Sequence, residues 1–282
     1  MAASINEKVH SKTVLVFREM VATLHATVKD KYHNCKDSDR ECYSDCDKRC
    51  SIFLEKLSTN TSDSIQQLLQ EFTPIVLDFT FINENILVNQ DFPESISTSV
   101  IQSVFNELEN IITVAKTILP DQQPIDSLGE ELLECIYWRK GALYYMYCKT
   151  IENNKDRINK DIQQYQKYLV SGIENLKMML ETRKPVVKDR SYAVTEDEDT
   201  FDLIKSGIYS DTHVLALIYG SELCYWLDKC DKENLFQTNH LDYKQIGQCY
   251  LKLYIQVVNG PLKNQGWSVE NAESMLKSIE ES

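Results

Sequence analysis

Long stretches without glycine or proline constrain this chain most. Its 282 residues include only 8 Gly and 6 Pro. A sandwich or barrel of short strands needs a turn about every 8–12 residues, and Gly and Pro supply many of those turns. The chain therefore lacks the turn residues for many strands, and long unbroken segments favour helices. Hydrophobic residues make up 43% of the sequence, which is near the globular average and sufficient for a buried core.

Apolar residues recur at steps of three and four through most of the chain, the spacing of one helix face. Residues 65–89 are the most ambiguous of these segments, because Ile75–Phe81 could be a strand on propensity alone, although helical spacing continues across it. Pro74 predicts a kink or a fresh helix start there, because proline removes a backbone hydrogen bond. Residues 184–200, with the acidic run Glu196–Asp199, predict an exposed loop. We expect an all-α fold, a single irregular bundle of about nine or ten helices over residues 1–282. The expected helices span residues 5–33, 42–57, 65–89, 96–119, 127–151, 158–183, 210–228, 243–258 and 268–279.

Acidic residues outnumber basic ones by 43 to 30, which gives a formal net charge of −13. A field of that sign repels nucleic-acid phosphates and anionic lipids, so neither is an expected partner. We expect no secretory signal and no membrane-spanning segment, since the longest apolar candidate, Val214–Leu227, is short and contains Glu222. The nine cysteines lie mostly in apolar periodic segments, which is typical of reduced thiols in the cytosol.

Cys42, Cys46 and Cys50 are the candidates for a metal site, with Cys35 and His33 nearby. Thiolate zinc sites usually contain a pair of cysteines separated by two residues, whereas here three residues separate successive thiols. That spacing places the three thiols on one helix face and favours a core stripe over a zinc site.

Two helix starts carry capping signals. Ser64 or Asp63 can cap the helix that follows the polar connector at 58–63, and Ser210 or Asp211 can cap the helix that begins near residue 210. Ser210, Asp211 and His213 also suggest a hydrolase. However, residues this close on one helix do not place the base between nucleophile and carboxylate, so capping is the favoured interpretation.

Motifs for cofactor chemistry are absent from the sequence. It contains no glycine-rich phosphate loop, no G-x-S-x-G turn and no C-x-x-C pair. We therefore expect no catalytic residue and no cofactor. Glu134, Trp138 and Arg139 lie close together on one expected helix and predict either a charge pair on the helix surface or an interface anchor. Trp and Arg are both enriched in binding hot spots. The alternative is that Trp138 and Trp226 are core aromatics, which we favour for Trp226.

Four groups of segments, in order from about residue 65 to the C-terminus, resemble the family of the Rab-interacting subunit of the Mon–Ccz guanine-nucleotide-exchange complex. These segments are long and idiosyncratic, which makes the resemblance specific. They are Ile75–Val88 with Asp91–Glu94, Leu128–Cys148, Ser206–His213 with Cys224–Trp226, and Gly260–Trp267 with Asn271–Ala272.

The resemblance implies a non-enzymatic adaptor that binds the late-endosomal Rab GTPase and its Mon–Ccz exchange complex. It also implies a role in Rab stability and membrane recruitment during autophagic removal of mitochondria. We therefore expect a cytosolic protein that its partners recruit to mitochondrial or late-endosomal surfaces. The alternatives are a zinc-stabilised helical module and a general acidic helical scaffold without a Rab link.

The resemblance carries over no catalytic or cofactor residue. Residues 1–60 depart from the family pattern, so we expect a divergent N-terminal helical hairpin there and a family-like core over 61–282. Within that core we predict that Asp91, Glu94, Trp138 and Arg139 contact partners.

Overall fold

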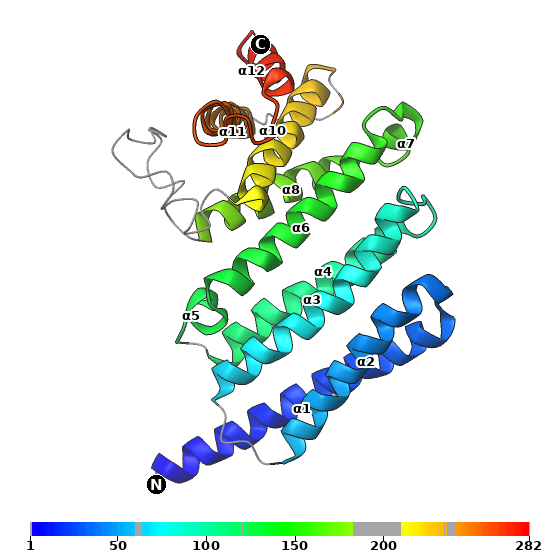
Figure 1. Ribbon diagram of the computed structural model, residues 1–282, viewed down its shortest axis with the longest axis vertical. Helices are drawn as coiled ribbons and strands as arrows, with labels where there is room; N and C mark the ends of the chain where they lie inside the picture. Colours follow the sequence, from blue (N-terminus) through cyan, green and yellow to red (C-terminus); the bar gives the residue numbers. More distant parts are fainter. Residues whose placement is uncertain are drawn as a thin grey trace. The chain divides into compact units, whose positions relative to one another are not determined.

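The computed structural model describes residues 2–59, 64–119, 121–182, 210–233, 235 and 241–281, with side chains from residue 13 onward except at 241. The described residues form helices and no strands, which confirms the all-α prediction. No helix among them is long and apolar enough to cross a membrane. The expected acidic loop at 184–200 lies outside the described residues. The helices are α1 Ala2–Asn34, α2 Asp37–Ser58, α3 Ile65–Asn89, α4 Ser97–Ile118, α5 Pro124–Leu128, α6 Glu130–Ile151, α7 Lys155–Lys160, α8 Ile162–Thr182, α10 Asp211–Lys232, α11 Leu241–Asn259 and α12 Glu270–Glu280 (Figure 1).

The chain divides into two compact units, Met1–Leu133 and Glu134–Ser282, and the division falls in the first turn of α6. The prediction of one domain over 1–282, with a divergent hairpin over 1–60 and a family-like core over 61–282, stays a prediction.

In the first unit, α1, α2 and α3 pack as successive antiparallel helices. The Arg18 guanidinium donates a hydrogen bond to Ser58 Oγ at 2.9 Å, which joins the middle of α1 to the end of α2. Lys56 Nζ lies 2.5 Å from Glu71 Oε2, which joins the end of α2 to the first turns of α3. The residues of both links are at least partly exposed to solvent. The apolar core therefore contributes more to the stability of this unit than the two links do.

Three phenylalanines form the centre of that core. The Phe72 ring stacks on Phe53 with centroids 5.9 Å apart and meets Phe17 edge-on at 6.1 Å. All three are buried, and Cys46 and Cys50 are buried on the same face of α2 as Phe53. The stripe predicted for this helix therefore faces the core at Cys46, Cys50 and Phe53, whereas the prediction is wrong for Cys42, which is exposed.

α3 begins at the expected cap and continues through its proline. Ser64 Oγ accepts a hydrogen bond from the backbone N–H of Gln67 at 3.2 Å, which confirms the predicted capping residue. Pro74 lies inside the helix, so the predicted alternative of a fresh helix start is wrong. Thr73 is fully buried beside the proline and donates its hydroxyl to the Leu69 carbonyl at 2.8 Å. Burial on both sides of Pro74 offsets the one missing backbone hydrogen bond, because packing dominates helix stability in a folded protein.

The turn between α3 and α4 is a Schellman motif without glycine. The backbone N–H of Phe92 donates to the Leu87 carbonyl at 3.0 Å, and that of Asp91 donates to Val88 at 3.1 Å. Asp91 and Phe92 both have φ of 50°, the left-handed region that costs non-glycine residues free energy. The buried Phe92 side chain holds this turn in place. The segment Asp91–Glu94, between the helices expected at 65–89 and 96–119, therefore forms a defined turn.

In the second unit, α8 packs closely against both α6 and α10. A Cβ added at Gly141 would lie 2.6 Å from Leu176 Cγ, and one added at Gly172 would lie 2.7 Å from Leu223 Cδ1. These distances are shorter than the normal van der Waals distance between two carbon atoms. Glycine, which has no Cβ, therefore permits the helices to approach this closely.

The turn between α11 and α12 contains the segment Gly260–Trp267. Its Leu262 is nearly buried, and the Leu262 backbone N–H donates to the Val257 carbonyl at 3.0 Å. The Tyr254 hydroxyl donates to the Ser268 carbonyl at 2.9 Å, which attaches the far end of the turn to α11. These two hydrogen bonds thus attach both ends of the turn before α12 to α11.

Candidate interaction site

Four aromatic rings from α6 and α10 stack face to face, and we call them the aromatic ladder. Tyr219 stacks on Trp138 with centroids 5.8 Å apart and on Tyr145 with centroids 3.7 Å apart. Tyr145 in turn stacks on Trp226 at 5.7 Å, and every interplanar angle is 16° or less. Residue numbers rise together along the two helices, so α6 and α10 run parallel. Each helix contributes residues seven apart, which lie two turns apart on one helix face.

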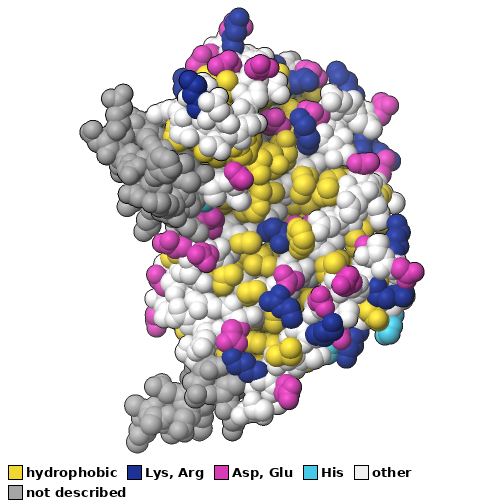
Figure 2. Space-filling view, in the orientation of Figure 1, with side chains coloured by type: hydrophobic (Ala, Val, Ile, Leu, Met, Phe, Trp, Pro, Cys, Tyr) yellow, Lys and Arg dark blue, Asp and Glu magenta, His cyan; other side chains and the backbone are white. Residues whose placement is uncertain are grey.

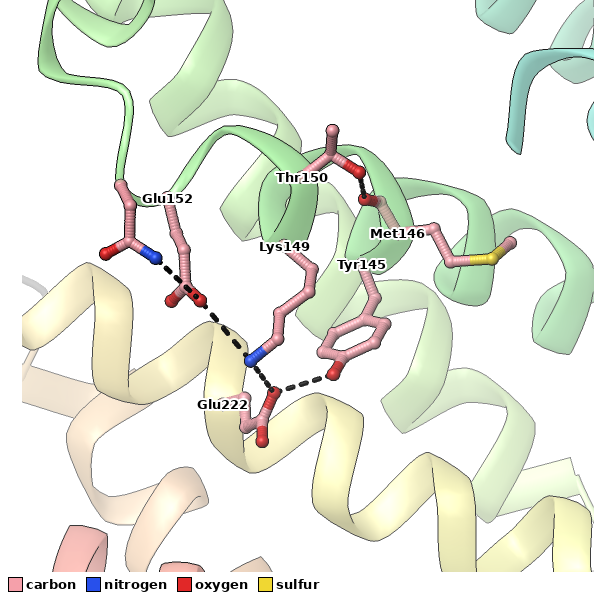
Figure 3. A network of polar contacts seen from close by, with 7 residues as sticks. Tyr145, Met146, Lys149, Thr150, Glu152 and Glu222 are labelled. Carbon is pink, nitrogen blue, oxygen red and sulfur yellow. Dashed lines mark hydrogen bonds and ion pairs between the residues drawn. The ribbon is translucent and has the colours of Figure 1, made fainter. Parts of the chain in front are cut away.

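A polar network fixes the middle of the ladder (Figure 3). From α6, the Tyr145 hydroxyl donates to Glu222 Oε2 of α10 at 2.6 Å, and Lys149 Nζ lies 3.4 Å from the same oxygen. Lys149 also lies 3.3 Å from Glu152 Oε1 and 5.2 Å from the Trp226 ring centroid. Burial raises the pKa of Tyr145 far above its ordinary value, and the hydrogen bond to Glu222 adds to this. Tyr145 therefore remains a hydrogen-bond donor at physiological pH.

The ladder has an open end and a closed end. Trp138 and Tyr219 are half-buried, whereas Tyr145 is 8% exposed and Trp226 is 5% exposed. Trp226 is thus the core aromatic that the sequence favoured. Half-buried Trp and Tyr combine a large apolar surface with a polar edge, the combination enriched at protein interfaces. Among the described residues, the open end is thus the more exposed part of the ladder.

A cavity of about 160 Å³ lies beside the closed end of the ladder, within the second unit. The lining residues divide by exposure into buried, mainly apolar side chains and more exposed, polar or charged ones. The first group comprises Ile158, Tyr165, Trp226 and Cys230, with half-buried Leu235; the second comprises Glu152, Lys155, Asn159, Lys229 and Glu233.

The four predicted partner-binding residues occur in different parts of the chain. Asp91 and Glu94 are exposed in the α3–α4 turn of the first unit. Trp138 and Arg139 are half-buried on α6 in the second unit. The sequence indicated Trp138 and Trp226 of the ladder, but it gave no role to Tyr145, Tyr219 or Glu222. The seven-residue spacing of the aromatic residues was the available signal.

Ser210 occupies the N-cap position of α10 as expected, but its hydroxyl does not cap the backbone. Its Oγ lies 2.7 Å from His213 Nδ1, and His213 Nε2 lies 3.6 Å from Glu134 Oε1 of α6. The imidazole therefore lies between a hydroxyl and a carboxylate, which local spacing did not predict. Asp211, the carboxylate considered from the sequence, is exposed. Since His213 and Glu134 are buried, the arrangement forms a polar link between α6 and α10.

The N-terminal thiols differ in exposure. Cys46 and Cys50 are buried, whereas Cys42 is exposed. A hydrogen bond from the Cys46 thiol lowers the pKa of Cys50 and raises that of Cys46. Cys46 also points toward the Ile75 carbonyl of α3, 4.0 Å away. No group of three or more His, Cys, Asp or Glu side chains in the described part of the chain could hold a metal ion.

Comparison with known proteins identifies the family. The model of the family described as RAB7A-interacting MON1-CCZ1 complex subunit 1 matches residues 48–280. The chain belongs to this family. It is 38% identical over 242 residues to the relative of that name from Danio rerio, covering 83% of this chain and 87% of the relative. Relatives of the same name from Mus musculus and Homo sapiens are 35% and 34% identical, over 83% and 81% of this chain and 86% and 84% of their own lengths. No solved structure matches the chain.

The family match confirms the resemblance given by the sequence motifs. It includes the whole aromatic ladder, the α3–α4 turn and Cys50, and it leaves residues 1–47 outside.

Proposed function

We propose that this chain is a non-enzymatic adaptor that binds the late-endosomal Rab GTPase RAB7A and the MON1–CCZ1 exchange complex. Family membership supports the proposal, because the relatives are named for both partners and are similar over more than four fifths of this chain. The observation that carries the choice of surface is the open end of the aromatic ladder, where Trp138 and Tyr219 stack and are half-buried. Arg139, the neighbour of Trp138, belongs to the same proposed surface.

The α3–α4 turn is the second proposed contact region. Asp91 takes a position where glycine would avoid the strain of a left-handed backbone, so selection for stability alone would favour glycine there. Its carboxylate is exposed, as is that of Glu94. We infer that these carboxylates meet a basic partner surface.

In the cell, the adaptor would support the stability and membrane recruitment of the Rab during autophagic removal of mitochondria. Its net charge of −13 disfavours direct contact with anionic lipid. Recruitment from the cytosol to mitochondrial or late-endosomal surfaces would therefore depend on partners.

A pull-down with the purified full-length chain tests the proposal. RAB7A in its GDP-bound and GTP-analogue-bound forms and the purified MON1–CCZ1 complex serve as separate prey. We expect at least one of them to bind. A variant with Asp91→Ala, Glu94→Ala, Trp138→Ala and Arg139→Ala should bind at least about tenfold more weakly, because interface hot spots contribute roughly 2 kcal/mol or more each.

Circular dichroism spectra establish that the variant is folded. Absence of binding by the unsubstituted chain to either prey would refute the adaptor function. Equal binding by the folded variant would refute the choice of surface and leave the function standing.

A further inference from the structure

The cavity beside the closed end of the aromatic ladder has the size and chemistry of a docking pocket. We propose that it receives one large apolar side chain of a protein partner, and that a partner carboxylate next to this side chain pairs with Lys229. The protein nature of the occupant rests on the proposed adaptor function.

The cavity volume sets the size of the group that enters. At about 160 Å³, it is similar to apolar protein cavities of about 150 Å³ that hold a benzene molecule. A phenylalanine ring or a leucine or methionine side chain therefore fits, whereas a peptide backbone segment does not. A single inserted side chain is the arrangement typical of an interface anchor.

The inner walls set the polarity of that group. Ile158, Trp226 and Cys230 are at most 7% exposed and present apolar surfaces. Burial raises the pKa of the Tyr165 hydroxyl far above its ordinary value, so this wall is also uncharged. A charged group inside would lose its hydration without an opposite charge to replace it. The inserted side chain is therefore apolar.

The mouth of the cavity sets the neighbouring charge. Lys155 Nζ lies 3.8 Å from Glu233 Oε2, and Glu152 is held by Lys149. Lys229 is exposed and has no ion pair in the part of the chain that the structure describes. Acidic and basic side chains are interspersed on the face of the molecule in Figure 2, and an exposed lysine without an ion pair attracts a carboxylate. The mouth thus selects an acidic residue beside the apolar anchor.

Two dipeptide probes test the pocket without any partner protein. The full-length chain labelled with 5-fluorotryptophan gives one 19F signal from each of its three tryptophans, assigned by Trp→Phe variants. Acetyl-Phe-Glu-amide at millimolar concentration should shift the Trp226 signal and leave that of Trp138 in place. Acetyl-Phe-Lys-amide should bind at least about fivefold more weakly. No shift at Trp226 with either dipeptide would overturn the pocket.

Charge reversal at the mouth tests the role of Lys229. Lys229→Glu should reverse the preference, so that acetyl-Phe-Lys-amide binds more tightly than acetyl-Phe-Glu-amide. Lys167→Glu, at an exposed lysine of α8 that does not line the cavity, is the matched control and should leave the preference unchanged. An unchanged preference in Lys229→Glu would overturn the charge assignment.

The same variants in the pull-down separate the pocket from the adaptor function. We expect Lys229→Glu to weaken capture of RAB7A or of MON1–CCZ1 by at least about fivefold, with Lys167→Glu unaffected. If the unsubstituted chain binds a partner and Lys229→Glu binds it equally well, the pocket does not dock that partner and the adaptor function stands. If the unsubstituted chain binds neither partner, the adaptor function fails, and the dipeptide experiment still decides whether the pocket takes an apolar and acidic ligand.

Discussion

Replacing Tyr145 with phenylalanine isolates the hydrogen bond that fixes the middle of the aromatic ladder. Phenylalanine keeps the ring that stacks on Tyr219 and Trp226 and removes only the hydroxyl. The bond to Glu222 is short, at 2.6 Å, as expected for a hydroxyl that donates to a carboxylate. Hydrogen bonds to charged groups contribute roughly 1.5–3 kcal/mol to the free energy of unfolding.

The surroundings of Glu222 place the expected loss of unfolding free energy in Tyr145→Phe at the low end of that range. Its side chain is 15% exposed and lies 3.4 Å from Lys149, so water and the ammonium partly replace the lost hydroxyl. We therefore expect Tyr145→Phe to lower the free energy of unfolding by about 1.5 kcal/mol. This corresponds to a decrease of roughly 3–6 °C in the melting temperature of a domain of about 150 residues.

A double-mutant cycle with Glu222→Ala, which removes the acceptor, is measured by urea unfolding and checks the assignment. The coupling free energy between positions 145 and 222 should be about 1 kcal/mol or more. Tyr219→Phe is the matched control, since it removes a half-buried hydroxyl from the neighbouring rung, and it should change stability by less than about 0.5 kcal/mol. Equal effects of Tyr145→Phe and Tyr219→Phe, or zero coupling, would show that the Tyr145–Glu222 hydrogen bond does not stabilise the packing of α6 against α10.

Three further changes test other parts of the fold. Gly141→Ala should lower the free energy of unfolding, measured with urea, by about 1 kcal/mol, because overpacking against Leu176 costs more than the gain in helix propensity. A gain in stability would contradict the close approach of α6 and α8 at this position. Asp91→Gly should raise the melting temperature, because glycine removes the strain of the left-handed backbone, worth roughly 1–2 kcal/mol, and this gain exceeds the entropic cost of glycine. A lower melting temperature would mean that the Asp91 side chain stabilises the turn. Burial raises the pKa of Tyr43 to about 12, so the stability that its protonated hydroxyl contributes is complete below pH 10 and is lost as the pH rises through 12. In urea unfolding between pH 10 and 12, the free energy of unfolding should therefore fall less steeply with pH in Tyr43→Phe than in the unsubstituted chain.

Apolar periodicity predicted the long helices because a helix of 20 residues repeats its pattern many times. The segment at 65–89, where a strand at Ile75–Phe81 was the alternative, is one helix with the same bounds, so the strand alternative is wrong. The segment predicted at 210–228 differs from α10 mainly at its C-terminal end. The short helices α5 and α7 were not predicted, since five or six residues contain too few periodic positions. The continuous helix at Pro74 was also missed, because the burial that offsets the lost hydrogen bond depends on the tertiary structure.

The candidate site was less predictable because its parts come together only in the tertiary structure. Residue type identified Trp138, but the stack with Tyr219 requires α6 and α10 to run parallel and adjacent. The same holds for the contact between Glu134 and His213, which are far apart in the sequence. No sequence pattern within one helix specifies which helix lies beside it.

The aromatic ladder also predicts that a change at a buried rung affects the geometry of the open end. An aliphatic core between two helices tolerates small rotations, whereas stacked rings with one buried hydrogen bond allow fewer arrangements. The hydrogen bond between Tyr145 and Glu222 joins α10 to α6 next to the stack of Tyr219 on Trp138, so we expect its loss to change how these two rings lie. If partners use this surface, Tyr145→Phe should weaken binding even where the chain remains folded, through the altered position of Trp138. A variant that loses stability but binds unchanged would mean that the open end keeps its geometry without the buried hydrogen bond.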